Sequence, residues 1–454
     1  MAKFEKFAYK SLEDLESKIK ELGVNLKLNK DLSPLSRGVK IGNTKTPNAI
    51  AILPMEGCDS NSDGSPSDLV FRRYKRFASG GAGLLWFEAC AVVPEGKANP
   101  LQLSINQENI KSFKELVDMS NSEAKKACGE NHVPVKILQL THSGRYSKPN
   151  GKAEPIIAQH DPLLDPPVGA AGDYPVATDE YLDSLPEKYA KAAALAREAG
   201  FDGVDIKSCH RYLFSEVLSA FTREGKYGGS FENRTRLMLS TIEAVKKTVG
   251  NDFIIASRFN VFDSHPYPYG FGVDKDDCWK SDLTEPLKFV ELLKKAGVNL
   301  LSNSAGNPYF RFPQVTRPFD TPTLNGEIPD EHPIESVARL FEFTRRIQHT
   351  VPDIPVIGNG YSWLRQFIGY AGAANIADGS VTMMGIGREA FAYPDAPKDL
   401  LEKGQMDPKK VCIACSKCTQ IMRDGGRTGC VIRDTEVYVP LYNEAREKAT
   451  AAGK

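Results

Sequence analysis

The stretch GVDIKSCHRYLFSEVLSAFTREGKYGGSFENRTR, residues 203–236, organises the interpretation of the whole chain. Val204 and Ile206 belong to a short apolar run that is typical of a buried strand. The run ends at a cluster of ionisable side chains, which predicts a reaction centre directly after the strand. A Gly-Gly pair then precedes Ser230, which predicts the N-cap of a following helix. The ionisable cluster consists of Lys207, Cys209, His210, Arg211 and Tyr212.

Seven further apolar runs resemble the one at 203–207, and helical patterns separate them. A buried parallel strand is nearly continuous in apolar residues, and eight strand–helix alternations are what a (β/α)8 barrel requires. We therefore predict an α/β fold, a TIM barrel, with a doubly wound sheet as the alternative. The predicted strands are 49–53, 82–87, 133–140, 203–207, 253–259, 298–302, 354–357 and 380–384, with helices centred near Tyr74, Leu116, Ala193, Leu239, Leu292, Phe341, Ile368 and Leu400.

The second half of the opening stretch resembles the Old Yellow Enzyme family of FMN-dependent ene-reductases. That family has two His or Asn residues three apart, then Gly-Tyr-Leu, and later Tyr-Gly-Gly-Ser-x-Glu-Asn-Arg, which this chain carries at 227–234. His210 and Tyr212 match the first half of the pattern. Lys207 replaces the first His or Asn, and Arg211 replaces the usual Gly. The resemblance implies that Tyr212, His210 and Lys207 form the catalytic group.

Residues that directly follow the predicted strands should line an active site, because barrel enzymes place theirs at the carboxyl ends of the strands. The resemblance implies that Pro54, Met55 and Ala89 lie along the edge of a flavin and that Gln139 binds its pyrimidine end. It further implies that Arg258 lies near flavin N1 and the ribityl chain. Glu56 departs from the Thr or Cys that is common beside the flavin carbonyl. The phosphate is expected on Gly360, Gly387 and Arg388.

Physical chemistry supports these assignments independently of the resemblance. A phosphate dianion needs backbone N–H groups free of Cβ interference together with a fixed positive fork, which glycines and Arg388 provide. The Gln139 amide offers one acceptor and two donors, which suits a flavin edge that presents both kinds of group.

Four cysteines crowd near the C-terminus with the spacing C-x2-C-x2-C-x11-C. Three cysteines at two-residue intervals can wrap one cubane while a fourth comes from further along, so the spacing predicts a 4Fe-4S cluster, with structural zinc as the alternative. The segment resembles the branch of the family that includes 2,4-dienoyl-CoA reductase, trimethylamine dehydrogenase and 2-enoate reductase. We expect an N-terminal extension at 1–47, an FMN-binding barrel at 48–405 and a cluster segment at 406–454. The ligands are Cys412, Cys415, Cys418 and Cys430.

The amino-acid composition limits the kinds of partner that we expect for this protein. Among 454 residues, 58 Lys and Arg balance 58 Asp and Glu, which argues against nucleic acid or an anionic membrane surface as a partner. The start MAKFEKFAYK has no apolar core, no long apolar stretch follows, and nine cysteines with one cluster favour a reduced compartment, so we expect a cytoplasmic protein. Residues 11–22 predict an amphipathic helix capped by Ser11 and stopped by Gly23, which we place under the barrel.

The leading hypothesis is an ene-reductase, of the NADH:flavin oxidoreductase type, that carries FMN and a 4Fe-4S cluster and reduces an α,β-unsaturated carbonyl compound or enoyl thioester. His210 and Lys207 would hydrogen-bond the developing enolate oxygen, and Tyr212 would protonate the α-carbon. No G-x-G-x-x-G motif opens a later βαβ unit, so we expect electrons from a ferredoxin or flavoprotein, with NAD(P)H as the alternative donor. The rivals are an oxidative amine dehydrogenase or demethylase and a flavin electron-transfer subunit.

Overall fold

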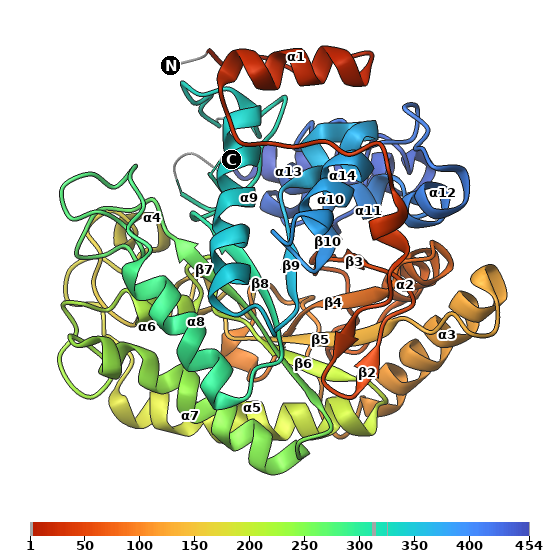
Figure 1. Cartoon of the computed structure of the whole chain (residues 1–454). Helices are drawn as coiled ribbons and strands as arrows, with labels where there is room; N and C mark the ends of the chain where they lie inside the picture. Colours follow the sequence, from red (N-terminus) through yellow and green to blue (C-terminus); the bar gives the residue numbers. More distant parts are fainter. Residues whose placement is uncertain (1–2, 311–314, 325, 454) are drawn as a thin grey trace.

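A computed structural model describes residues 3–310, 315–324 and 326–453, and within these ranges eight parallel strands close into a barrel (Figure 1). The last strand returns to the first, with Met384 opposite Ile50, and this pairing completes the ring. The predicted TIM barrel is confirmed, and each predicted strand overlaps an observed one. The barrel strands are β3 (Ile50–Ile52), β4 (Leu84–Ala91), β5 (Val135–Thr141), β6 (Gly203–Ile206), β7 (Ile254–Phe262), β8 (Leu300–Ala305), β9 (Val356–Gly358) and β10 (Met383–Ile386).

The strands read as continuous apolar runs because both of their faces are buried. Along β3 and its flanks, Ala49, Ala51 and Leu53 belong to the cluster inside the barrel, while Ile50 and Ile52 pack outward against the helices. This alternation follows from the two-residue period of side chains along a strand. The side chains inside the barrel therefore form a packed floor beneath the carboxyl ends of the strands.

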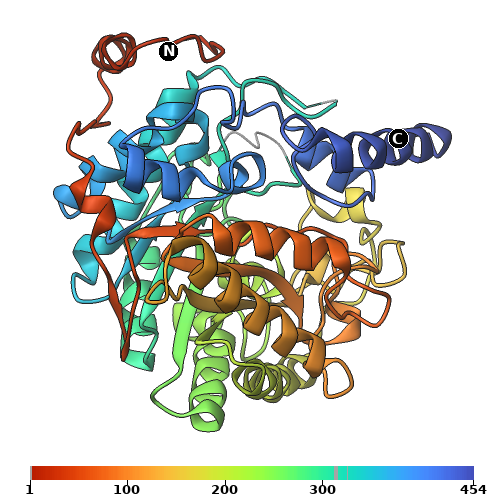
Figure 2. The same cartoon turned by 90° about the vertical axis from the view of Figure 1, so that its right-hand side faces the viewer.

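Helices surround the barrel on its outer side (Figures 1 and 2). Each follows a strand and packs an apolar stripe against the sheet, as the predicted positions require. Within the described residues, no helix combines the length and the apolar character needed to cross a membrane. The outer helices are α2 (Asp68–Ser79), α3 (Ile110–Cys128), α5 (Asp179–Glu198), α7 (Phe231–Val249), α8 (Thr284–Ala296), α9 (Pro333–Thr350), α10 (Ile368–Ala377) and α12 (Ala396–Lys403).

Short helical elements lie in the loops at the strand ends, and two short strands pair into a hairpin before the barrel. Two-residue strands carry too little periodicity to be recognised from sequence, and the hairpin was not predicted. The hairpin strands are β1 (Lys40–Ile41) and β2 (Thr44–Lys45), and the short helical elements are η1 (Ser33–Ser36), η2 (Pro94–Gly96), η3 (Gly144–Tyr146), α4 (Asp165–Val168), α6 (Leu213–Leu218), η5 (Tyr361–Phe367) and α11 (Arg388–Ala392).

The N-terminal helix α1 (Leu12–Leu22) begins and ends where the sequence predicts, with a Ser11 capping box and a left-handed Gly23. Its place differs from the prediction. Lys18 on α1 pairs with Glu5 at 3.2 Å, and Glu5 lies 3.6 Å from His332, the N-cap of α9. Since α9 starts at the carboxyl end of β8, α1 lies beside the upper rim of the barrel and not under it (Figure 1). An amphipathic pattern predicts which face of a helix is buried, but not which part of the protein covers that face.

The C-terminal segment packs on the mouth of the barrel through α13 (Lys417–Arg423) and α14 (Thr435–Ala451). The Thr428 N–H donates to the Gly57 carbonyl after β3 at 2.6 Å. Asp434 accepts from both Arg72 and Arg76 of α2, at 2.7 and 2.5 Å, which anchors the segment to the outer ring. These contacts bring the predicted cysteine ligands to the end of the barrel where the strands finish.

Candidate active site and cysteine-lined cavity

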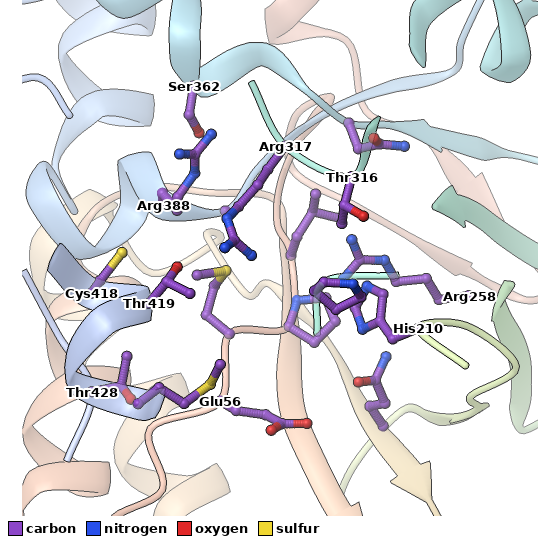
Figure 3. A pocket seen from close by; sticks show the side chains of 18 of the residues that line it. Glu56, His210, Arg258, Thr316, Arg317, Ser362, Arg388, Cys418, Thr419 and Thr428 are labelled. Carbon is purple, nitrogen blue, oxygen red and sulfur yellow. The ribbon is translucent and has the colours of Figure 1, made fainter. Parts of the chain in front are cut away.

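A cavity opens at the carboxyl ends of the strands, where the barrel predicts an active site, and its empty space, open solvent included, is about 1060 Å³. Figure 3 shows His210 and Arg258 on one side of it and Arg388 and Cys418 on the other, with Arg317 between them. The cavity brings together ten residues that the sequence analysis selected from separate strand ends. These ten residues are Pro54, Met55, Gln139, Lys207, His210, Tyr212, Arg258, Gly360, Gly387 and Arg388.

Ala89 is the one predicted flavin contact that does not line the cavity. It is 1% exposed and lies within β4, which runs to Ala91 and changes its register with β5 between Phe87 and Cys90. The predicted strand ends at Phe87, where the polar Glu88 interrupts the apolar run. Glu88 is instead buried, where it accepts from Arg73 and from the Gly57 N–H, both at 2.6 Å.

The wall formed by Arg388 and its neighbours suits an anion. Arg388 Nη2 donates to the Pro318 carbonyl at 2.6 Å, whereas the buried Nη1 has no partner among the residues that the structure describes. Burial, with the positive charges of Arg388 and Arg423, lowers the pKa of Arg317. A group of guanidinium ions with an unused buried donor is costly unless an anion joins them. A phosphate group bound here would supply the missing acceptor.

Two glycines stand on the same wall. Gly360 has φ +89°, a conformation that favours glycine, and a Cβ there would lie 2.8 Å from Leu340. A Cβ on Gly387 would lie 3.1 Å from the Met55 sulfur. In both cases the added atom would meet the protein itself, so the phosphate contact of these glycines stays a prediction.

Gln139 on β5 is oriented by a buried network beneath the cavity. Its Nε2 donates to Asp205 Oδ2 at 2.6 Å, and the Trp86 indole N–H donates to the same oxygen at 3.0 Å. The other oxygen, Oδ1, accepts from the Arg258 backbone N–H at 2.9 Å. Burial raises the pKa of Asp205 to about 7. The network fixes the Gln139 amide at the cavity wall, as a flavin-edge contact requires.

The loop after β6 presents the three predicted catalytic side chains. Lys207 Nζ donates to Glu56 Oε1 at 3.1 Å and lies 4.0 Å from the centre of the Tyr212 ring. His210 has a left-handed backbone, with φ 65°, and its buried Nε2 has no partner within the described ranges of the chain. Burial, with the positive charges of Lys207 and Arg258, lowers the pKa of His210 well below its usual range. The imidazole is therefore neutral and has an unused nitrogen for a ligand.

Tyr212 is 1% exposed and shares a hydrogen bond with Tyr309, with the two oxygens 2.7 Å apart. Burial, followed by the negative charge of Glu56, raises the pKa of Tyr212 well above its usual range. The phenol therefore keeps its proton, which is the state a general acid needs.

Arg211 stands where the family has Gly, and it is not one of the residues that line the cavity with His210 and Tyr212. It too is left-handed, with φ 60, and its buried guanidinium pairs with Asp263 at 3.0 Å and with Asp161 at 3.4 Å. These ion pairs compensate the strain that a non-glycine residue incurs in this conformation. Arg211 serves to hold the neighbouring loops.

The four predicted cysteine ligands line a second cavity, of about 370 Å³. The chain turns around it through left-handed Ala414 and Ser416, with φ 50 and 57. Backbone N–H groups of Ala414 and Arg433 point at the sulfurs of Cys412 and Cys430, at 3.4 and 3.3 Å. The set of cysteines is Cys412, Cys415, Cys418 and Cys430.

Among the residues that the structure describes, no three His, Cys, Asp or Glu side chains are arranged to hold a single metal ion. A single ion needs ligands that converge on one point, whereas a cubane places each thiolate on a separate iron. The 4Fe-4S cluster and the zinc alternative therefore both stay predictions. Arg388 and Cys418 line both cavities, so these two residues form a shared wall.

Several residues that line the large cavity were not predicted from the sequence. Three of them, Tyr309, Thr316 and Arg317, lie in the loop after β8. No site residue was predicted from this loop, although Asn307-Pro308-Tyr309 directly follows a strand, as the selected runs do. The C-terminal segment supplies further wall residues that follow no strand, so no positional rule could have found them. They are Thr419, Met422 and Thr428.

Comparison with known proteins identifies relatives of this chain. The chain is 30% identical to an NADH oxidase of Thermoanaerobacter brockii over 384 residues, which cover 83% of this chain and 52% of the relative. It is 30% identical to an NADPH dehydrogenase of Listeria welshimeri, over 61% of this chain and 74% of that protein. The chain thus spans about half the length of the first of these relatives.

Two solved structures share the fold at 19% identity. A 2-naphthoyl-CoA reductase complex matches with a TM-score of 0.69, over 91% of this chain and 58% of the other. An Old Yellow Enzyme homologue from Zymomonas mobilis matches with a TM-score of 0.59, over 83% and 94%. The sequence model of one family matches residues 34–303, more than half of the chain. The protein is therefore an oxidoreductase that belongs to the NADH:flavin oxidoreductase / NADH oxidase family, the Old Yellow Enzyme type.

Proposed function

We propose that the protein is an FMN-dependent ene-reductase that saturates a carbon–carbon double bond conjugated to a carbonyl, in an enone, an enoate or an enoyl thioester. One observation carries the proposal: a neutral imidazole, an ammonium group and a protonated phenol, from His210, Lys207 and Tyr212, line the same cavity as the residues suited to a flavin. The likeness to a reductase in complex with a naphthoyl thioester supports the thioester as one substrate class.

The residues proposed to hold FMN are those of the cavity wall. Arg388 offers its buried Nη1 to the phosphate, beside Gly360 and Gly387. Gln139 and Arg258 would contact the ring system, and Pro54 and Met55 would lie against its edge. Ala89 is proposed only as support beneath this edge, since it lies inside β4. When bound, reduced FMN supplies the hydride for the β-carbon.

The protein's own side chains would prepare the substrate for reduction. The buried Nε2 of His210 would donate a hydrogen bond to the carbonyl oxygen, and Lys207 would add positive charge where enolate charge develops. Tyr212 would give its hydroxyl proton to the α-carbon. The hydrogen on Nε2 requires that Nδ1 of the neutral ring carries none.

We further propose that residues 406–454 form a cluster segment, with Cys412, Cys415, Cys418 and Cys430 as ligands of a 4Fe-4S cluster beside the barrel of residues 48–405. Such a cluster supplies one-electron transfer. The shared wall of Arg388 and Cys418 supports an electron route between the two cavities. The proposed electron donor is a ferredoxin or a flavoprotein, with NAD(P)H as the alternative.

The test uses anaerobic protein reduced by dithionite, with excess reductant removed. Cyclohexenone, crotonate and crotonyl-CoA are added separately, and flavin reoxidation is followed by visible absorbance while the product is identified by mass. We expect reoxidation with at least one acceptor and a product heavier by two hydrogens. Oxidised protein is mixed with trimethylamine in parallel. Flavin reduction by the amine without reoxidation by any alkene would instead establish an amine dehydrogenase.

A further inference from the structure

Tyr309, on the loop that follows β8, shares a hydrogen bond with the buried Tyr212 hydroxyl, and both residues line the cavity. The two hydroxyl oxygens lie 2.7 Å apart, and either can act as the donor. Tyr212 is 1% exposed, whereas Tyr309 is partly exposed. Their rings are nearly parallel, at an interplanar angle of 17°. Both residues line the cavity, and Tyr309 is the more exposed of the two, although burial raises the pKa of its hydroxyl above the usual range.

Several contacts fix the position of Tyr309. Its ring packs on Tyr146, with the ring centres 4.3 Å apart, and its N–H donates to Asn307 Oδ1 at 3.0 Å. Asn307 Nδ2 in turn donates to the Tyr146 hydroxyl at 2.6 Å. Arg423 of α13 donates to the Pro308 carbonyl at 2.8 Å. The Tyr309 hydroxyl is thus preset beside Tyr212 and does not depend on a loop closing over the site.

A tyrosine that acts as an acid in every turnover must regain its proton in every turnover. After donation, Tyr212 is a phenolate on a side chain that is only 1% exposed. The Lys207 ammonium, 4.0 Å from its ring centre, offsets part of that charge, but burial and Glu56 oppose it. Rapid return of a proton is needed, and a hydroxyl already hydrogen-bonded to Tyr212 is the shortest route.

We propose that Tyr309 is a proton-relay residue that restores the proton of Tyr212. The Tyr212 O–H bond breaks as the α-carbon–hydrogen bond forms, the Tyr309 hydroxyl proton moves to the Tyr212 oxygen, and water at the cavity mouth protonates Tyr309. No electrons move in these steps, and one solvent proton is consumed for each double bond reduced. The inference deepens the proposed ene-reductase function and rests on Tyr212 as its acid.

One test needs no substrate. The exchange rate of the Tyr212 hydroxyl proton with solvent is measured by NMR in protein labelled with ¹³C at the tyrosine Cζ. In Tyr309→Phe, which keeps the packed ring and removes only the hydroxyl, we expect slower exchange, by roughly tenfold. If Tyr309 merely held the loop, its loss would loosen the site and exchange would become faster. Unchanged or faster exchange overturns the relay.

A second test uses turnover. In Tyr309→Phe the first reoxidation by an alkene is expected within about twofold of the wild-type rate, because Tyr212 already holds a proton, while steady-state turnover falls roughly tenfold. Tyr181→Phe is the matched control, since it removes a hydroxyl that bonds to His142 at 2.7 Å and to Glu95 at 3.1 Å outside the cavity. Equal slowing of first and later turnovers contradicts the relay.

Chemical rescue separates the relay from a structural role. Tyr309→Ala leaves space for a small proton carrier, so added imidazole should raise its steady-state turnover, while Tyr309→Phe, whose ring fills the space, should not respond. Absence of rescue in Tyr309→Ala counts against the proposal. If wild-type protein reduces no alkene but Tyr309→Phe still slows the Tyr212 exchange, the relay stands and the proposed function fails. If wild-type protein reduces alkenes and exchange is unchanged, only the relay fails.

Discussion

Lys207 Nζ lies 3.1 Å from Glu56 Oε1, and both residues depart from the pattern of the family that the sequence resembles. The Lys207 side chain is 2% exposed and that of Glu56 is 15% exposed, so the pair is largely removed from water. A lysine without this carboxylate would be an uncompensated charge in a buried site. The two departures thus form one ion pair at the edge of the cavity.

Glu56→Gln should therefore reduce the free energy of unfolding by about 1–3 kcal/mol, because it leaves the Lys207 ammonium buried without its counter-charge. Urea unfolding of the two proteins checks this. Glu21→Gln is the control, since Glu21 pairs with Lys18 at 3.0 Å but is 67% exposed, and its loss should fall within error. Lys207→Met in the Glu56→Gln background should restore much of the stability, and a further loss there would argue against coupling.

Arg388→Ala should weaken flavin retention about tenfold or more, because one charge-assisted contact to phosphate contributes about 1.5–3 kcal/mol. Retention is measured by equilibrium dialysis of the purified protein, with the cofactor identified as FMN or FAD. The exposed Arg236, altered to Ala, should leave retention unchanged. Bound FAD, or full retention of FMN in Arg388→Ala, would show that the phosphate lies elsewhere.

Tyr212→Phe should leave reduction of the flavin intact and slow only its reoxidation by an alkene, by roughly 10²- to 10⁴-fold. The phenol proton is needed only when the α-carbon is protonated, so the two half-reactions separate its role from a packing role. Stopped-flow absorbance measures each half-reaction alone. Equal slowing of both would mean that Tyr212 maintains the shape of the site.

Cys415→Ser should remove the iron, the acid-labile sulfide and the broad visible absorption that dithionite bleaches. Wild-type protein prepared without air should contain about four of each per chain. Cys128→Ser is the matched control, because Cys128 ends α3 outside the cysteine-lined cavity and should not affect the iron content. If the wild-type protein instead contains one zinc ion and no sulfide, the four cysteines form a structural zinc site and the cluster prediction is wrong.

The cluster as an electron route has its own test. Reduced ferredoxin should support turnover faster than NADH does in wild-type protein, and Cys415→Ser should abolish that advantage. If Cys415→Ser keeps its flavin and still turns over with reduced ferredoxin as fast as wild-type protein does, the cysteine-lined cavity has only a structural role.

Asp205 should make stability depend on pH. Burial raises its pKa in the folded protein to about 7, whereas an unfolded Asp titrates near 3.9. Between these values the folded state holds a proton that the unfolded state lacks, so the free energy of unfolding falls as pH rises through this window. Asp205→Asn should remove up to about 1.4 kcal/mol per pH unit of that slope in the flavin-free protein. Equal slopes in both proteins would contradict the assignment.

The sequence was sufficient for the barrel, because strands buried on both faces, such as 203–207, carry long apolar runs. It was also sufficient to select Gln139, Arg258 and Arg388, since each stands at or just after a strand end. Tyr309 and Arg317 were missed because the predicted site took no residue from the loop after β8, although that loop follows a strand end as the others do. Helix α1 was predicted under the barrel because an amphipathic pattern contains no information about which surface covers it. Ion pairs between residues far apart in the sequence, such as Glu56 and Lys207, could not be predicted, because the spacing of residues along the chain does not show which side chains meet in the fold.

The wall that Cys418, Thr419, Met422 and Thr428 add to the large cavity limits how this protein can be recombined with its relatives. The barrel strands end at Ile386, so a junction near residue 405 looks like a natural place to exchange modules. Such an exchange would leave the barrel intact and yet replace one side of the cavity, together with the Arg423 contact that positions Tyr309. A chimera that keeps its original reaction therefore needs both parts from the same parent.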